Sequence, residues 1–153
     1  MTFLRSAATA AVLAMTISAV YGHVTVQPKQ STAGATEQYT LRVPTEKFVP
    51  TVRIEVEFPA ALDVSSFEPK PSWRIEMKKN ASGRIVGAVL TGSIPPGDFS
   101  QFSFVARNPS EEGKLSFKAI QIYEDGTKSE WTGPEGTRTP APLIEVKKST
   151  PIR

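Results

Sequence analysis

The sequence predicts an all-β protein, a single β-sandwich that follows an N-terminal export signal. Three observations favour this fold class. Apolar residues recur with a period of two, which is typical of strands that bury one face. Turn residues recur about every 8–12 positions, as they do in sandwiches. No segment after residue 23 has the apolar spacing of an amphipathic helix, and the 13 prolines suit loops and edge strands.

The first 22 residues have the three parts of a secretory signal. Arg5 supplies a positive start, residues 7–20 form an uncharged apolar run, and Gly22 is a small residue suited to the position before the cut. The run is shorter than the roughly 20 apolar residues that span a membrane. We therefore expect residues 1–22 to be removed, so that His23 becomes the first residue of the mature chain. A cut after Ala19 is the alternative, and it would leave three residues ahead of His23.

Residues 23–147 are expected to form one domain, followed by a polar tail over 148–153. The mature chain of 131 residues is long enough to bury its own core. Arg5 is the one charged residue of the signal, so the mature chain keeps 17 basic and 15 acidic residues, a net charge of +2. This balance, without a clustered basic stripe, argues against a nucleic-acid partner. No second apolar run of membrane length follows the signal, so we expect no membrane anchor in the mature chain.

The first half of the mature chain contains one very clear strand. In segment 51–58, Val52, Ile54, Val56 and Phe58 alternate with polar residues, as they do when one face of a strand is buried. The other strands expected here lie at 24–27, 37–43 and 62–67, with a loop at 29–36. The segment 62–67 could also form an irregular corner.

The second half continues the alternation and adds strong turn signals. The sequence Asn80-Ala81-Ser82-Gly83 has turn composition, so residues 73–90 are predicted to form a hairpin. Asp125-Gly126 is a strong signal for a two-residue hairpin loop. Gln121 is a polar residue on an otherwise apolar strand face. The remaining strands are expected at 99–107, 115–123, 127–131 and 143–146, with turns or loops at 92–98, 108–113 and 133–142, which gives eight or nine strands in all.

His23 is the only histidine of the chain, and its expected place at the mature N-terminus decides its chemistry. A lone histidine is usually a surface residue or one satisfied by a hydrogen bond. At a chain terminus, its α-amine and its imidazole can form one chelate ring around a transition metal. Copper(II) heads the affinity series of divalent ions for nitrogen and oxygen ligands. Both nitrogens bind metal only when unprotonated, so binding should release protons and fail in acid.

Two nitrogens leave a copper site incomplete, and the sequence offers further candidates. Glu37 and Glu46 lie near expected strand ends, although a surface carboxylate is usually only solvated. Trp73 suits the core of the sandwich. Trp131, at a strand end beside a loop, is the better candidate for a partly exposed wall of a site.

The sequence lacks the signatures of several enzyme classes. It has no Gly-x-Ser-x-Gly elbow, no phosphate loop and no dinucleotide fingerprint. It has no cysteine, which excludes disulfides, thiol nucleophiles and thiolate metal sites. A Ser-His-Asp triad would need His23 as its base, and no nucleophile is marked for it. We therefore expect no enzymatic activity.

Several sequence blocks, in one order along almost the whole mature chain, carry a resemblance to a known family. They are His23-Val24-Thr25-Val26-x-Pro28, Ser31-x-Ala33-Gly34-Ala35-x-Glu37-x-Tyr39-Thr40, Arg42-Val43-Pro44-Thr45-Glu46-Lys47, Phe99-x-x-Phe102 with Phe104, Ala106-Arg107-Asn108-Pro109, Gln121-x-Tyr123-x-Asp125-Gly126, Trp131-Thr132-Gly133-Pro134 and Pro140-Ala141-Pro142. On these blocks the chain resembles the YcnI-like copper-binding family of exported bacterial proteins.

The resemblance implies a cupredoxin-like or immunoglobulin-like sandwich that holds one copper(II) ion per chain. The amine and imidazole of His23 would hold the ion, Glu46 would complete the coordination, and Trp131 would lie against the metal. Glu37, whose block also matches, is the second candidate carboxylate. The implied role is copper binding or delivery, as a chaperone or accessory protein and not as a catalyst. The implied location is the periplasm or the cell exterior, with other copper-handling proteins of the cell envelope as partners.

Two other functions remain open at this stage. A metal-free sandwich could bind a sugar or peptide on a platform formed by Trp131 and Tyr123, and tryptophan fluorescence would then be retained when copper is added. A copper monooxygenase would also use a terminal histidine, and it would consume oxygen in the presence of a reductant. Such enzymes need a second histidine, which this chain does not contain.

Overall fold

A computed structural model describes residues 22–150, and every regular element in this part of the chain is a β-strand. The all-β prediction is therefore confirmed. The expected signal, apart from Gly22, and residues 151–153 of the expected tail lie outside the described residues. The strands are β1 (Thr25–Gln27), β2 (Gln30–Thr32), β3 (Thr36–Pro44), β4 (Thr51–Glu57), β5 (Asp63–Phe67), β6 (Arg74–Lys79), β7 (Ile85–Ile94), β8 (Phe99–Arg107), β9 (Gly113–Ser116), β10 (Lys118–Tyr123), β11 (Lys128–Trp131) and β12 (Leu143–Lys147).

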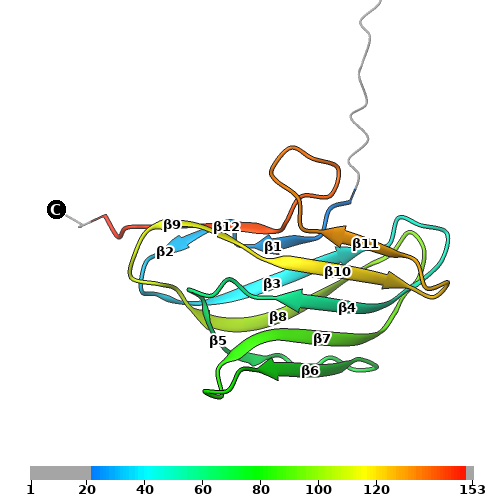
Figure 1. Cartoon of the computed structure of the whole chain (residues 1–153), viewed down its shortest axis with the longest axis horizontal. Helices are drawn as coiled ribbons and strands as arrows, with labels where there is room; N and C mark the ends of the chain where they lie inside the picture. The colour runs from blue at the N-terminus through cyan, green and yellow to red at the C-terminus, as the bar shows by residue number, and fades with distance from the viewer. Residues whose placement is uncertain (1–21, 151–153) are drawn as a thin grey trace, which may run out of the picture.

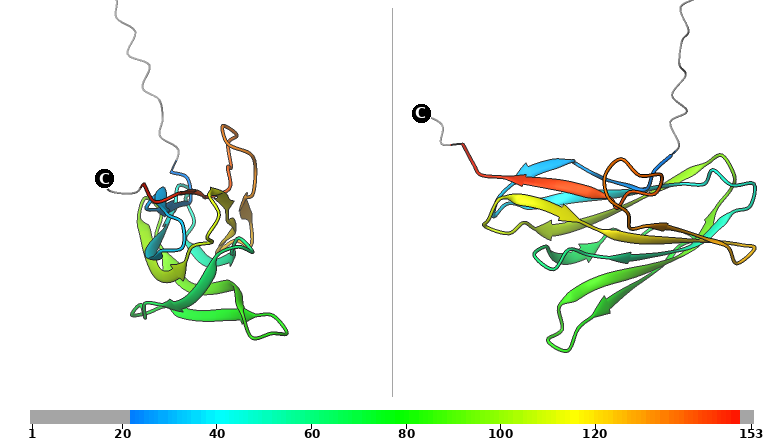
Figure 2. Two further views of the ribbon diagram at one scale, coloured as in Figure 1. Left: turned by 90° about the vertical axis from the view of Figure 1, so that its left-hand side faces the viewer. Right: turned by 45° about the horizontal axis from the view of Figure 1, so that its top comes forward.

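Nine of the strands form one long sheet that curls on itself (Figures 1 and 2). Its order is β1-β3-β8-β5-β7-β4-β10-β11, with β6 paired to β7. The pairing between β5 and β7 consists of a single register pair, Val64 with Ile85. The sheet bends at this weak seam, so that β1-β3-β8-β5 and β7-β4-β10-β11 become two facing layers. A smaller sheet, β2-β12-β9, contains the one parallel pair among the named strands of the described residues, β2 with β12.

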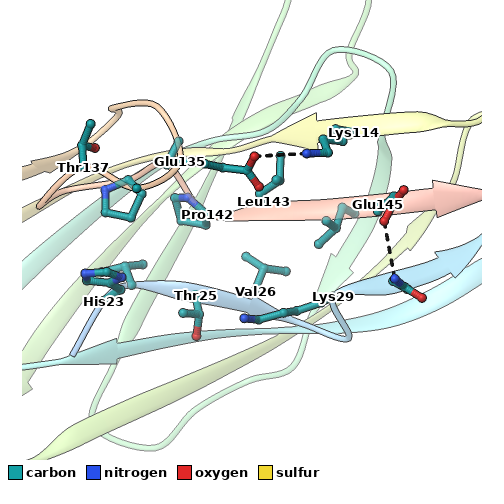
Figure 3. Close-up of a pocket in the computed structure, with 16 residues that line it drawn as sticks. His23, Thr25, Val26, Lys29, Lys114, Glu135, Thr137, Pro142, Leu143 and Glu145 are labelled. Atoms are coloured by element: carbon teal, nitrogen blue, oxygen red, sulfur yellow. Dashed lines mark hydrogen bonds and ion pairs between the residues drawn. The ribbon is translucent and has the colours of Figure 1, made fainter. Parts of the chain in front are cut away.

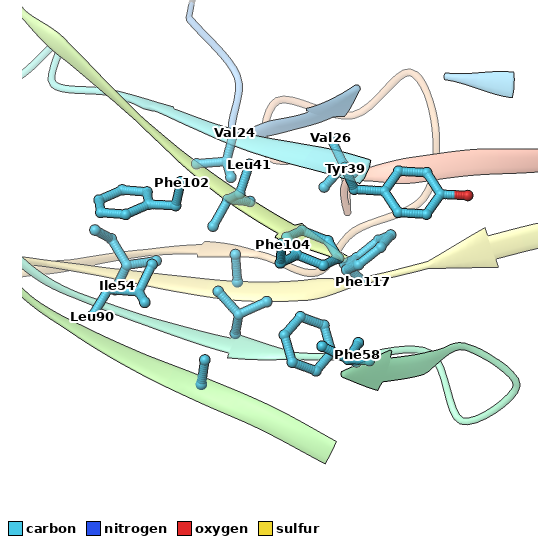
Figure 4. Close-up of a cluster of buried hydrophobic side chains, with 14 of the residues drawn as sticks. Val24, Val26, Tyr39, Leu41, Ile54, Phe58, Leu90, Phe102, Phe104 and Phe117 are labelled. Carbon is cyan, nitrogen blue, oxygen red and sulfur yellow. The ribbon is translucent and has the colours of Figure 1, made fainter. Parts of the chain in front are cut away.

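Aromatic side chains from both layers meet in the core (Figure 4). The ring of Phe104 on β8 lies 5.4 Å from that of Phe58, which follows β4, and 6.1 Å from that of Phe117, which precedes β10. Burial of one such side chain contributes about 1.5–3 kcal/mol to stability. Trp73 packs edge-on against Phe102, with ring centroids 4.7 Å apart, which confirms its expected role in sandwich packing.

The structure has more strands than the eight or nine expected. The expected loop 29–36 contains a short strand, β2. Its backbone pairs with β12, although its side chains show no apolar alternation. The expected strand 115–123 divides into β9 and β10 at Phe117, where the chain passes from the small sheet to the large one. The uncertain segment 62–67 forms β5.

Two predicted turns differ in detail from the structure. Strand β7 continues to Ile94, inside the expected turn 92–98, and Gly92 lies under the indole of Trp73, which leaves no room for a side chain. The hairpin at Asp125-Gly126 is confirmed, but its loop is longer than two residues, since the amide of Tyr123 donates to the carbonyl of Thr127. Gly126 has φ of +82°, which favours glycine. This hairpin directs β11 back along β10 toward the start of β1.

Residues 22–150 contain no helix of the length and apolarity needed to cross a membrane.

Candidate metal centre

The curl of the long sheet brings its two edge strands together at one end of the sandwich. His23 lies two residues before the first residue of β1, and Trp131 is the last residue of β11, at the opposite edge of the sheet order. Their ring centroids are 5.7 Å apart, with the planes tilted by 55°. Val24 and Val26 are almost completely buried, so they anchor β1 and hold the half-buried His23 beside the indole.

Glu46 reaches the same end of the sandwich from the end of β3. Strand β1 pairs with β3 in the register Thr25 with Arg42, so the chain before Thr25 runs alongside the end of β3, and Gly22 lies against Pro44 and Glu46. The Glu46 carboxylate accepts a hydrogen bond from the backbone N–H of Gly22. The carboxylate therefore lies beside Gly22, the residue that precedes the predicted cut.

His23, Glu46 and Trp131 line one solvent-open pocket of about 950 Å³. The structure thus brings together the three residues that the sequence analysis named for the metal. The remaining wall consists of Lys47, Tyr123, Ser129 and residues 136–139.

Glu37 does not reach this pocket. It lies near the start of β3, seven residues before Pro44, which corresponds to about 23 Å along a strand. Its carboxylate accepts a hydrogen bond from the hydroxyl of Ser31 (2.8 Å). The structure therefore separates Glu37 from His23 and Trp131.

A buried amide supports the wall of the pocket, and it was only partly predictable from the sequence. Gln121 has no exposed surface, and its Oε1 accepts a hydrogen bond from the indole Nε1 of Trp131 (3.0 Å). Its Nε2 donates to the carbonyl oxygen of Pro44 (2.7 Å) and to the hydroxyl of Thr51 (2.6 Å). The polar position on an apolar strand face was visible in the sequence, but its three partners were not.

Trp131 is more buried than the sequence suggested. Only 7% of its surface is exposed, and Tyr123 is 4% exposed, so neither ring offers a free face for stacking a sugar or peptide.

Burial raises the pKa of the Tyr123 hydroxyl, and the nearby Glu46 carboxylate raises it further, while the hydrogen bond with Ser129 opposes both. A hydroxyl whose pKa is raised in this way stays protonated at physiological pH.

The charges of the pocket do not suit a hard cation. Within residues 22–150 there is no group of three or more histidine, cysteine or carboxylate side chains placed to hold a metal. Lys47 and Arg138 add positive charge to a pocket with one carboxylate. The Lys47 ammonium lies 4.3 Å from the centre of the Tyr123 ring and donates to the hydroxyl of Thr127 (3.2 Å). Calcium and magnesium need several oxygen ligands, whereas an imidazole with one carboxylate suits a late transition metal.

His23 also borders a groove of about 520 Å³ between β1 and β12 (Figure 3). The loop after β11 roofs this groove, and Gly136 and Thr137 of that loop line both cavities. An ion pair between Lys114 and Glu135 (3.1 Å) fastens the loop to β9. The sequence predicted a loop at 133–142, but not that it passes beside His23.

Comparisons with known proteins agree with this architecture. Residues 23–146 match the protein family described as "Domain of unknown function (DUF1775)". The chain is 35% identical over 132 residues to "Copper-binding protein CutI" of Bacillus subtilis (strain 168). This alignment covers 85% of this chain and 65% of that protein. The chain thus spans less than two thirds of the length of this relative.

Solved structures identify the type of sandwich. An uncharacterized protein from Nocardia farcinica, described as having an immunoglobulin-like fold, superposes with a TM-score of 0.69 and 31% identity, over 81% of this chain and 97% of that one. A cohesin module from Clostridium perfringens, at 14% identity, superposes with a TM-score of 0.54 over 84% of this chain and 98% of the module, and shows likeness of fold alone. The fold is immunoglobulin-like, as the resemblance implied. The match over residues 23–146 establishes that the chain belongs to the DUF1775 family, which confirms the YcnI-like resemblance seen in its sequence.

Proposed function

We propose that this chain is an exported copper-binding protein that holds one copper(II) ion at its mature N-terminus. The observation that carries the proposal is the pocket shared by His23, Glu46 and Trp131, because three distant segments of the chain converge there. The name of the Bacillus subtilis relative, a copper-binding protein, supports the choice of metal. The YcnI-like resemblance supports the assignment of the ligands.

The proposed ligands are the α-amine and imidazole of His23 and the carboxylate of Glu46. A cut after Gly22 would create the amine and would also remove the N–H that Glu46 accepts from in the uncut chain. The carboxylate would then face the new terminus, free to bind a metal. The Trp131 indole, 5.7 Å from the imidazole, would cover one side of the ion and limit its access to water.

The proposed biological role is copper handling in the periplasm or outside the cell, as a chaperone or an accessory protein. The pocket is open to solvent, so a partner protein could reach the metal directly. Other copper-handling proteins of the cell envelope are the proposed donors and acceptors. Binding and delivery, rather than catalysis, is the proposed activity. Oxygen consumption by the copper-loaded protein in the presence of a reductant would instead favour a monooxygenase.

A copper(II) titration of residues 23–153 with a free His23 amine tests the proposal. We expect saturable quenching of tryptophan fluorescence at one equivalent, together with the electron paramagnetic resonance spectrum of a single copper(II) site. His23→Ala should raise the dissociation constant by more than about 100-fold, since loss of a direct ligand should exceed the effect of losing a supporting residue. Absence of saturable binding would reject the proposal and favour a metal-free interaction domain.

A further inference from the structure

Gln121 is a completely buried polar side chain that the proposed site does not use as a ligand. It lies on β10, where its neighbours along the strand face, Ala119 and Tyr123, are also buried. Burial of an amide costs free energy unless its polar atoms are paired. Gln121 meets this requirement in full, because the described residues leave no buried side-chain nitrogen or oxygen without a partner.

The three hydrogen bonds of Gln121 permit only one orientation of its amide. The indole N–H of Trp131 can only donate, and the carbonyl of Pro44 can only accept. The Gln121 oxygen must therefore face Trp131 (3.0 Å), and its nitrogen must face Pro44 (2.7 Å). The second hydrogen of the nitrogen is donated to the hydroxyl of Thr51 (2.6 Å).

These bonds join the two walls of the metal pocket across the gap between the layers. Trp131 forms one wall, at the end of β11. Pro44 ends β3 and lies two residues before Glu46, which forms the other wall. The hydroxyl of Thr51 also meets that of Thr45 (2.6 Å), so the residue before Glu46 is held from the same network.

We propose that Gln121 is a positioning residue of the copper site, which sets the indole of Trp131 and the Glu46 turn at a fixed separation around His23. The proposal rests on the proposed copper function. An apolar side chain of the same length would fill the space but would leave the indole N–H and the Pro44 carbonyl unpaired. Each wall could then shift independently, and the ligands would lose their preorganised geometry.

The test compares Gln121→Met with Asn108→Leu, both in residues 23–153 carrying Trp73→Phe, so that Trp131 is the one tryptophan. Asn108 is a matched control, because it is also a buried amide with three side-chain hydrogen bonds but lies beside Ser31 and Tyr39, outside the pocket. Gln121→Met should raise the copper(II) dissociation constant about tenfold or more, the usual effect of losing a supporting residue. It should also shift the emission maximum of Trp131 in the metal-free protein. Asn108→Leu should change the copper(II) dissociation constant by less than about twofold, because Asn108 does not support the pocket. It should leave the emission maximum of Trp131 unchanged.

A second variant covers the case in which Gln121→Met does not fold. Gln121→Asn keeps the amide but is one methylene shorter, so it cannot reach both Trp131 and Pro44, and it should weaken copper binding by at least about threefold. If the unmodified protein binds copper and both Gln121 variants bind it as Asn108→Leu does, the positioning role is rejected while the copper function stands. If the unmodified protein binds no copper, both proposals fail.

Discussion

Two buried amide side chains hold the two ends of the sandwich, and their hydrogen bonds are arranged in the same way. At one end the hydroxyl of Tyr39 donates to Asn108 Oδ1 (2.6 Å), and Asn108 Nδ2 donates to Ser31 Oγ and to the carbonyl of Thr32, both at 2.8 Å. At the other end Gln121 takes the place of Asn108, with the Trp131 indole as its donor, and with the carbonyl of Pro44 and the hydroxyl of Thr51 as its acceptors.

The two ends differ in the carboxylate and histidine side chains that lie near the amide. At the Asn108 end the nearby carboxylate, Glu37, is hydrogen-bonded to Ser31 and has no histidine beside it. At the Gln121 end the carboxylate of Glu46 shares an open pocket with His23. A buried amide network is thus present at either end of this fold, and only the Gln121 network lies beside the proposed copper site.

The largest expected effect is on the free energy of unfolding, and it tests whether Asn108 and Gln121 stabilise the fold equally. Asn108→Leu and Gln121→Met should each lower the free energy of unfolding of the metal-free protein by about 2–4 kcal/mol, because each leaves buried donors or acceptors unpaired at about 1–3 kcal/mol apiece. Chemical denaturation followed by circular dichroism measures both losses. A loss below about 0.5 kcal/mol for one of them would show that the two networks are not equivalent.

The next effect compares the two carboxylates. Glu46→Gln should raise the copper(II) dissociation constant about tenfold, since it removes the proposed charged ligand but leaves both nitrogens of His23. Glu37→Gln should leave the constant unchanged within about twofold. Competition titrations against a chelator of known affinity measure both values. The assignment of Glu46 would be overturned if Glu37→Gln proved to be the weaker binder.

The smallest effect concerns the tyrosines at the two ends. Burial raises the pKa of both Tyr39 and Tyr123, and a carboxylate raises it further in each case, Glu37 at one end and Glu46 at the other. The hydroxyls should thus ionise more readily in the unfolded chain, near pH 10. The two protonated hydroxyls therefore contribute to the free energy of unfolding below about pH 10. This contribution is lost as the pH rises through their folded-state pKa values.

Thermal unfolding between pH 8 and pH 11 measures this loss. The melting temperature should fall above about pH 10, and Tyr39→Phe and Tyr123→Phe should each make the fall less steep. A decline of unchanged steepness in both variants would mean that other groups cause the alkaline destabilisation.

The fold could be predicted from the sequence to the extent that side chains alternate. Strands β4 and β8 carry their burial pattern in the chain itself, and both lie close to the expected positions. Strand β2 escaped prediction because its own three side chains are polar, and only its backbone pairing with β12 makes it a strand. The division at Phe117 escaped it because the alternation continues through the point where the chain changes sheets.

The candidate site was predictable only in part, and for a different reason. The expected terminal position of His23 followed from the predicted signal, and the choice of Glu46 and Trp131 followed from the family resemblance. No spacing along the chain indicates that residues 23 and 131 meet, because their contact depends on the curl of a nine-stranded sheet. The same curl brings Gln121 to Pro44, so the partners of this buried amide could not be read from the sequence.

The most direct test of the central claim compares two forms of the protein that differ only in their starting point, residues 23–153 and residues 20–153. Both contain the same imidazole and carboxylate, but in the longer form the α-amine lies three residues away from His23. The copper(II) dissociation constant should be at least about 100-fold larger for the longer form, because the chelate ring with the amine cannot form. Equal dissociation constants for the two forms would contradict a copper site built on the terminal histidine.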